Sequence, residues 1–127
     1  MRATDWRGEV DESDRLVLES AFQRSRAALG SDHPITLGLA GHLTFVNSRL
    51  GQAERARILG EDTLQRSQAA FGSNHLISLA AAAALTCALT ELDQTERARI
   101  LGEDALQRSQ AALGPDQLIT QTLSHRH

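Results

Sequence analysis

Histidines, adjacent carboxylates and one cysteine are the residues of this 127-residue chain whose types could support chemistry. His33 and His75 lie 42 residues apart in similar segments, and the pairs Glu61-Asp62 and Glu103-Asp104 share that separation. Acid–base catalysis needs such groups held close together around one reacting atom. A histidine that recurs at equivalent positions is more typical of a turn, and neighbouring residues on a helix point about 100° apart. We therefore expect no catalytic residue among them.

The remaining candidates are the cysteine and two histidines near the C-terminus. Cys87 lies in an apolar segment, where a thiol packs as a small hydrophobic group. His125 and His127 supply two ligands, whereas a structural zinc site takes about four. The sequence contains no HExxH, Gly-x-Ser-x-Gly, phosphate-loop or CxxC motif. We predict a protein that is not an enzyme and that uses no metal and no cofactor.

Composition narrows the class of protein further. The formal net charge is −3, and every basic side chain other than histidine is arginine. Nucleic acids and anionic membranes favour basic stretches, so we expect neither as a partner. No apolar stretch approaches the roughly 18 residues of a membrane span, and the N-terminus lacks the apolar run of a signal peptide. Together with the single cysteine, these features predict a cytoplasmic protein.

The sequence repeats itself at a step of 42 residues, and this repeat determines which structural elements position these side chains. Residues 53–72 match residues 95–114 at 17 of 20 positions, and residues 11–30 match 53–72 at 9 of 20. A fixed period of this length is the signature of a solenoid, in which each unit buries its apolar face against its neighbours. Such proteins usually present a surface rather than enclose an active site.

Helix signals divide each unit into two helices. We expect a flexible leader over 1–10 and one domain over 11–127, with helices at about 12–28, 35–50, 53–70, 77–92 and 95–112 and a partial helix at 117–124. We name the second and fourth of these A helices, and the first, third and fifth B helices. Glycines should end the B helices in a left-handed conformation, at Gly30, Gly72 and Gly114. Short polar side chains should cap the following A helices, namely Asp32, Asn74 and Asp116.

The B helix at 53–70 has a wide apolar surface and one charged face. A stripe at helical spacing is formed by Ala56, Leu59, Thr63, Ser67 and Ala70, and it is widened by Ile58, Leu64 and Phe71. We expect this surface to pack on two neighbouring helices. Oppositely charged residues four positions apart should pair: Arg57 with Glu61, Asp62 with Arg66, Arg99 with Glu103 and Asp104 with Arg108. These pairs favour a solvated outer face over a charged docking strip.

The order of these motifs resembles a known family. It reads Leu29-Gly30-x-x-His33-Pro34-x-Thr36-Leu37, then Leu50-Gly51-Gln52, then Ala56-Arg57-x-Leu59-x-Glu61-Asp62-Thr63-Leu64-x-Arg66. This order is similar to the long tetratricopeptide repeat of the kinesin-light-chain type, particularly as found in actinobacterial regulatory proteins. The resemblance implies an all-α fold of antiparallel helix pairs stacked as a right-handed superhelix. It also implies a concave groove, lined by the A helices, that binds a protein or peptide.

One departure from the family's pattern concerns that groove. Members commonly carry Asn-Asn-Leu-Ala in the A helix, but the equivalent positions here hold Gly41-His42-Leu43-Thr44 and Ala83-Ala84-Leu85-Thr86. Small residues predominate in both A helices, including Ala81 and Ala88. We predict a shallow protein-binding groove formed by Gly38, Gly41, His42, Phe45, Asn47, Ala80, Ala83, Ala84 and Cys87. The alternative is that these small residues serve close helix packing.

The number of repeats bears on association. Solenoids generally need about three repeats and polar capping units, whereas this chain has two full repeats and parts of others. Both ends of the stack should therefore expose apolar surface. We expect a homo-oligomer, joined end to end or by helix exchange. The alternative is a self-assembling or regulatory fragment of a larger repeat protein.

Overall fold

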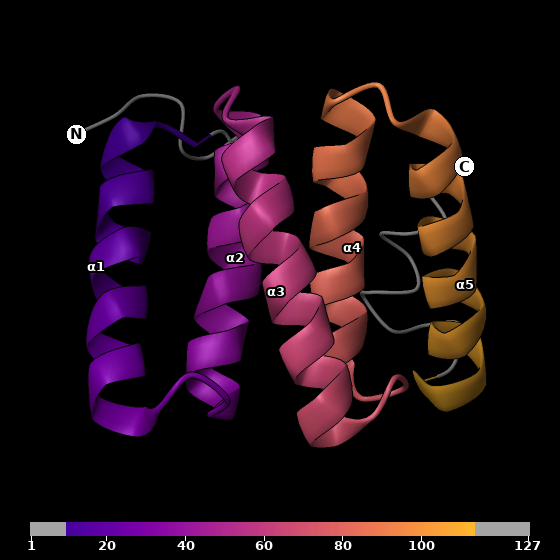
Figure 1. Ribbon diagram of the computed structural model, residues 1–127, viewed down its shortest axis with the longest axis horizontal. Helices are drawn as coiled ribbons and strands as arrows, with labels where there is room; N and C mark the ends of the chain where they lie inside the picture. Colours follow the sequence, from indigo (N-terminus) through magenta and orange to yellow (C-terminus); the bar gives the residue numbers. More distant parts are fainter. Residues whose placement is uncertain (1–9, 114–127) are drawn as a thin grey trace.

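Five antiparallel helices make up the computed structural model, which describes residues 10–113 (Figure 1). They are α1 (Glu12–Leu29), α2 (Pro34–Arg49), α3 (Ala53–Phe71), α4 (Leu76–Glu91) and α5 (Thr95–Leu113). The predicted all-α stack of helix pairs is confirmed, and each helix end lies within one residue of its expected position. The leader, apart from Val10, and the expected helix at 117–124 lie outside the described residues, as do Gly114 and Asp116.

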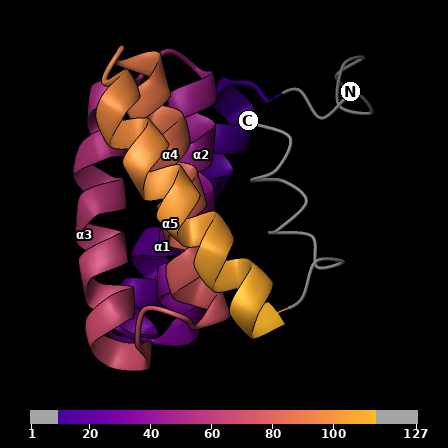
Figure 2. The same cartoon turned by 90° about the vertical axis from the view of Figure 1, so that its right-hand side faces the viewer.

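The helices form two unequal layers. The A helices α2 and α4 pack directly on each other, and α3 packs against both of them. The B helices α1, α3 and α5 stand further apart: within residues 10–113, neighbouring B helices have no Cα atoms within 8 Å of each other. Figure 2 shows α3 on one side of α2 and α4, with α5 running obliquely across α4. The spacing between the B helices leaves room for surface hollows.

A glycine sets the close approach of α3 to the A helices. A Cβ atom at Gly60 would lie 3.0 Å from Cγ2 of Thr44 on α2 and 3.2 Å from Cδ1 of Leu85 on α4. These distances are shorter than ordinary van der Waals contacts between carbon atoms. The absence of a side chain at this position therefore lets one helix contact two others.

Histidines, rather than the expected aspartate and asparagine, cap the A helices. The Nδ1 atoms of His33 and His75 accept hydrogen bonds from the backbone N–H groups of Ile35 and Ile77, at 3.1 Å in each case. The prediction that Asp32 caps α2 was wrong because that residue lies one position too early. The recurring histidines are thus helix caps, which agrees with the expectation of a turn role.

The glycines after the B helices adopt a more restricted conformation than expected. Gly30 has φ 95° and ψ 161°, and Gly72 has φ 90° and ψ 161°. The sign of φ agrees with the prediction, but these ψ values lie in an extended region that is essentially limited to glycine, not in the left-handed helical region. The turns after the A helices have positive φ at Gly51, 78°, and at Asp93, 60°.

Candidate functional site

The A face, defined here as the exposed and half-buried side chains of α2 and α4, carries most of the predicted protein-binding residues. Gly38, His42 and Ala80 are exposed. Four more are half-buried on the same two helices: Gly41, Phe45, Ala83 and Cys87. Because α2 and α4 pack directly on each other, these residues belong to one surface composed mainly of small side chains.

Other expected members of this surface are buried. Asn47 is only 3% exposed, so the expectation that it decorates the groove is corrected. It lies two residues after Phe45, and two helical steps of about 100° turn it to the opposite side of α2. Its Oδ1 atom has no hydrogen-bond partner among the described residues. Four alanines of α4 are also buried in the core, namely Ala81, Ala82, Ala84 and Ala88.

Ile35 and Arg49 are among the side chains of the A face that were missed from the sequence. Ile35 is 56% exposed and lies one helical turn before Gly38. The guanidinium of Arg49 lies over the ring of Phe45, with Cζ 5.9 Å from the ring centroid. Both could have been found by extending the helical spacing from Gly38 and Phe45 by three or four residues. They add an aliphatic group and a cation to the two ends of the α2 surface.

Ion pairs cover the outer side of the B helices. The four pairs expected from the sequence are present, each at 2.9 Å. Arg57 also donates to Glu54, and its hydrogen bonds to Glu54 and then to Glu61 raise the pKa of the guanidinium. Arg99 has the same arrangement with Glu96 and Glu103. The raised pKa keeps the guanidinium groups of Arg57 and Arg99 protonated near neutral pH.

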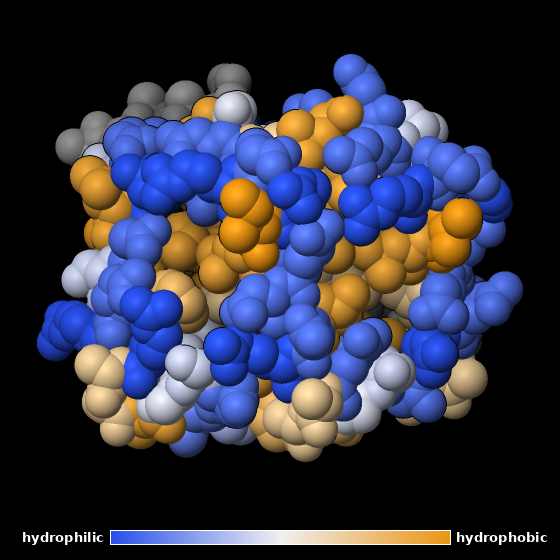
Figure 3. Space-filling view, in the orientation of Figure 1, coloured by the Kyte–Doolittle hydropathy of each residue, from blue (hydrophilic) through white to orange (hydrophobic). Residues whose placement is uncertain are grey.

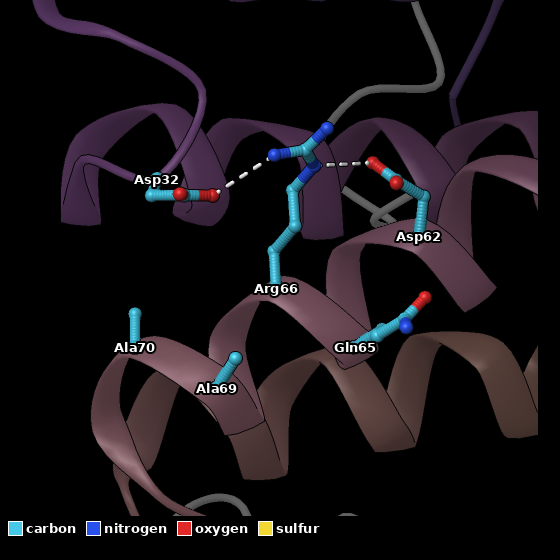
Figure 4. Close-up of a pocket in the computed structure, with 6 residues that line it drawn as sticks. All are labelled: Asp32, Asp62, Gln65, Arg66, Ala69 and Ala70. Atoms are coloured by element: carbon cyan, nitrogen blue, oxygen red, sulfur yellow. Dashed lines mark hydrogen bonds and ion pairs between the residues drawn. The ribbon is translucent and has the colours of Figure 1, made fainter.

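A polar hollow beside α3 is organised around Arg66 (Figure 4). The guanidinium donates to Oδ2 of Asp62 at 2.9 Å and to Oδ1 of Asp32 at 3.1 Å, and both bonds raise its pKa. One repeat later, Arg108 donates to Oδ1 of Asn74 at 3.0 Å. These bonds tie the loop before each A helix to the following B helix. Asp32 and Asn74, expected as caps, therefore act as loop anchors.

Comparison with known protein families decides the identity of the repeat. A model described as tetratricopeptide repeat matches residues 36–76 and 78–118, together more than half of the chain. The chain belongs to the tetratricopeptide repeat family. The two matches begin 42 residues apart, in agreement with the internal repeat. No curated protein matches the chain. Tetratricopeptide repeats (TPRs) commonly bind protein partners and are generally non-catalytic.

A second surface of this TPR chain lies between two B helices. A hollow of about 510 Å³ separates α3 from α5, and its floor is provided by α4. It is lined by Glu61, Leu64, Gln65, Gln68, Leu85, Leu89, Arg97, Ile100, Leu101 and Asp104. Figure 3 views the molecule from the side of α3 and shows apolar side chains in hollows between hydrophilic ones. We call this side, formed by α1, α3 and α5, the B face.

Large aliphatic side chains recur on the B face at the repeat step. Leu16, Ile58 and Ile100 occupy equivalent positions on α1, α3 and α5 and are 55%, 58% and 55% exposed. The expectation that Ile58 packs against a neighbouring helix was wrong, because adjacent B helices do not close over it. The spacing of 42 residues between these side chains was visible in the sequence, but their exposure depends on the tertiary packing.

The described part of the TPR chain contains neither a cluster of metal ligands nor a membrane-spanning helix. Residues 10–113 contain no group of three or more His, Cys, Asp or Glu side chains arranged to hold a metal ion. His125 and His127 lie outside the described residues. Across α1 to α5, none of the helices combines the length and apolar character needed to cross a bilayer.

Proposed function

We propose that this TPR chain is a non-catalytic interaction module whose A face binds a helical segment of another protein. The supporting observation is the set of small and apolar side chains exposed along two A helices that pack on each other, among them Gly38 and Ala80. Small residues allow the backbone of a partner helix to approach closely, and an amphipathic helix would place its apolar side there. We also assign the repeat to the long kinesin-light-chain-like type, on its 42-residue step, and its action to the cytoplasm.

The character of the A face favours a helix over an extended peptide. An extended peptide presents unpaired backbone groups that need side-chain hydrogen bonds, but the positions of the family's asparagine pair hold Gly41-His42 and Ala83-Ala84. A helix satisfies its own backbone groups and needs mainly apolar contact. Phe45, with Arg49 above its ring, supplies a phenyl group to this surface.

Two bulky substitutions test the proposal. Gly38 and Ala80 are equivalent by the repeat and exposed, so Gly38→Trp and Ala80→Trp should leave the fold intact and block a docking helix. The matched control is Ala69→Trp, on the exposed surface of α3. The three variants and the native chain are used to capture proteins from an extract of the source cell. Mass spectrometry identifies the captured proteins, and binding of the purified partner is then measured by calorimetry.

The expected result is a partner that binds the native chain and Ala69→Trp but binds both A-face variants at least about tenfold more weakly. Circular dichroism and light scattering should give the same helicity and mass for all four proteins. A partner retained by both A-face variants would refute the assignment of the A face. Loss of binding by Ala69→Trp alone would move the site to α3.

A further inference from the structure

The hollow between α3 and α5 is open because of specific residue differences between repeats. The corresponding gap one repeat earlier lies between α1 and α3. There, Phe22 and Arg26 of α1 occupy the positions that are equivalent by the repeat to Leu64 and Gln68 of α3. Phe22 is buried, and the guanidinium of Arg26 covers its ring at 5.3 Å from the centroid. The smaller Leu64 and the uncharged Gln68 leave the second gap unfilled.

The wall of this hollow that α5 forms carries a basic, an apolar and an acidic side chain in that order along the helix. Arg97, Ile100 and Asp104 lie at positions i, i+3 and i+7 of α5, so they share one stripe of the helix. All three side chains are about half exposed. Along α5 the stripe therefore reads positive, apolar and negative.

We propose that the B face pairs with the B face of a second copy of this chain, through a two-fold axis that passes near Ile100. The two α5 helices then run antiparallel across each other. This places Arg97 of each copy opposite Asp104 of the other, and the two Ile100 side chains at the centre beside the hollows. A two-fold interface requires one patch to complement itself, and the order positive, apolar, negative has that property when it is reversed.

The existing ion pairs of these residues are compatible with this arrangement. Arg97 donates to Oε2 of Glu61 at 3.1 Å, and Arg108 donates to Oδ2 of Asp104 at 2.9 Å. Arg97 also donates to Oε1 of Gln94 at 2.9 Å, which leaves three of the five N–H donors of its guanidinium for a partner. A carboxylate accepts several hydrogen bonds at once. The second copy therefore extends these pairs rather than replacing them. It also covers Ile100, which the chain alone leaves exposed.

Oligomeric state tests the interface directly. Light scattering and sedimentation velocity on the full chain, from about 1 to 500 µM, should show a monomer–dimer equilibrium. Ile100→Glu enters a two-fold interface twice and should weaken the dimer by at least about 100-fold. Ile35→Glu, at a similarly exposed isoleucine of α2, is the matched control and should leave the dimer unchanged. Equal circular dichroism spectra exclude misfolding as the cause.

Charge exchange distinguishes this geometry from other modes of association. Arg97→Asp and Asp104→Arg should each weaken the dimer by about tenfold, and the double variant should return to within about threefold of the native constant. The repeat-equivalent change Arg55→Asp has the same charge difference outside the hollow and should have no effect.

Three results would overturn the proposal. These are a native chain that stays monomeric over the whole concentration range, a dimer insensitive to Ile100→Glu, and a double variant no better than the single ones. A dimer lost instead in Val17→Glu, at the exposed end of the stack on α1, would assign association to the ends. The A-face variants Gly38→Trp and Ala80→Trp should dimerise normally, so this test is separate from that of partner binding.

Discussion

Replacing Gly60 with alanine should destabilise the chain, although alanine is the better helix former. The added Cβ would lie 3.0 Å from Cγ2 of Thr44 and 3.2 Å from Cδ1 of Leu85, on two different helices. Neither α2 nor α4 can move away from the methyl group without opening its contact with the other. The matched change is Gly38→Ala, at a helical position where, within residues 10–113, no atom beyond the adjacent residues and the nearby backbone of α2 lies within 4 Å of the new Cβ.

The two substitutions should change stability in opposite directions. Replacing glycine by alanine inside a helix contributes about 1 kcal/mol. At Gly38 this gain should be realised in full, whereas at Gly60 overpacking costs about 1–3 kcal/mol. We expect a net loss of about 1 kcal/mol for Gly60→Ala and a gain of about 1 kcal/mol for Gly38→Ala. For a domain of this size the difference corresponds to about 8 °C in Tm.

Thermal and urea unfolding, followed by circular dichroism, measure both changes. Thr44→Ser provides a further check, because it removes Cγ2 but keeps the hydroxyl that donates to the carbonyl of Ala40 at 2.8 Å. The double variant of Thr44→Ser and Gly60→Ala should recover part of the loss, with a favourable coupling of about 0.5–1 kcal/mol. If Gly60→Ala stabilised the chain as much as Gly38→Ala, close approach of α3 to two helices would not constrain this position.

Further predictions concern a turn, the core and the charged surface. Gly30→Ala should cost about 1–3 kcal/mol because its φ of 95° and ψ of 161° suit only glycine, and urea unfolding measures the loss. Asn47→Leu should raise stability by about 1 kcal/mol in the same assay, since Oδ1 lacks a partner among the described residues and the equivalent Leu89 is buried. Hydrogen bonds from Arg57 and Arg99 lower the pKa of Glu54 and Glu96 below 4.5. The contribution of these two carboxylates to the stability of the fold is therefore complete above pH 4.5 and is lost as the pH falls through the lowered pKa values. In a melting series from about pH 6 to pH 3, Glu54→Gln with Glu96→Gln should lose less stability than the native chain.

The helices and their surface pairs could be predicted from the sequence because they depend on local spacing. Residues four positions apart on a helix meet whatever the rest of the chain does, so the pair Arg57–Glu61 followed from the sequence alone. The cap at His33 was missed because a histidine next to an aspartate is the less common cap. Its recurrence at His75, beside Asn74, was the available signal.

The surfaces could be predicted only in part, because exposure depends on which helices meet. Ile58 has the spacing of a core residue, but it is exposed because no Cα atom of α3 lies within 8 Å of one in α1 or α5. The polarity of Asn47 predicts a surface residue, but its side chain lies on the buried side of α2. The hollow between α3 and α5 depends on three helices at once and had no local pattern.

The two faces of the chain differ in how strictly the repeat preserves them. The A helices match at only 5 of 15 positions between 36–50 and 78–92, and four of the five matched residues are buried: Leu37, Ala40, Leu43 and Thr44. Every exposed position of α2 after its first turn differs from its equivalent in α4. The B helices α3 and α5, in contrast, repeat their exposed side chains almost unchanged. A surface that varies from repeat to repeat suits a partner with its own distinct sequence, whereas a surface that repeats itself suits a partner with the same period. Another copy of this chain has that period, and this difference separates the partner expected on the A face from the one proposed for the B face.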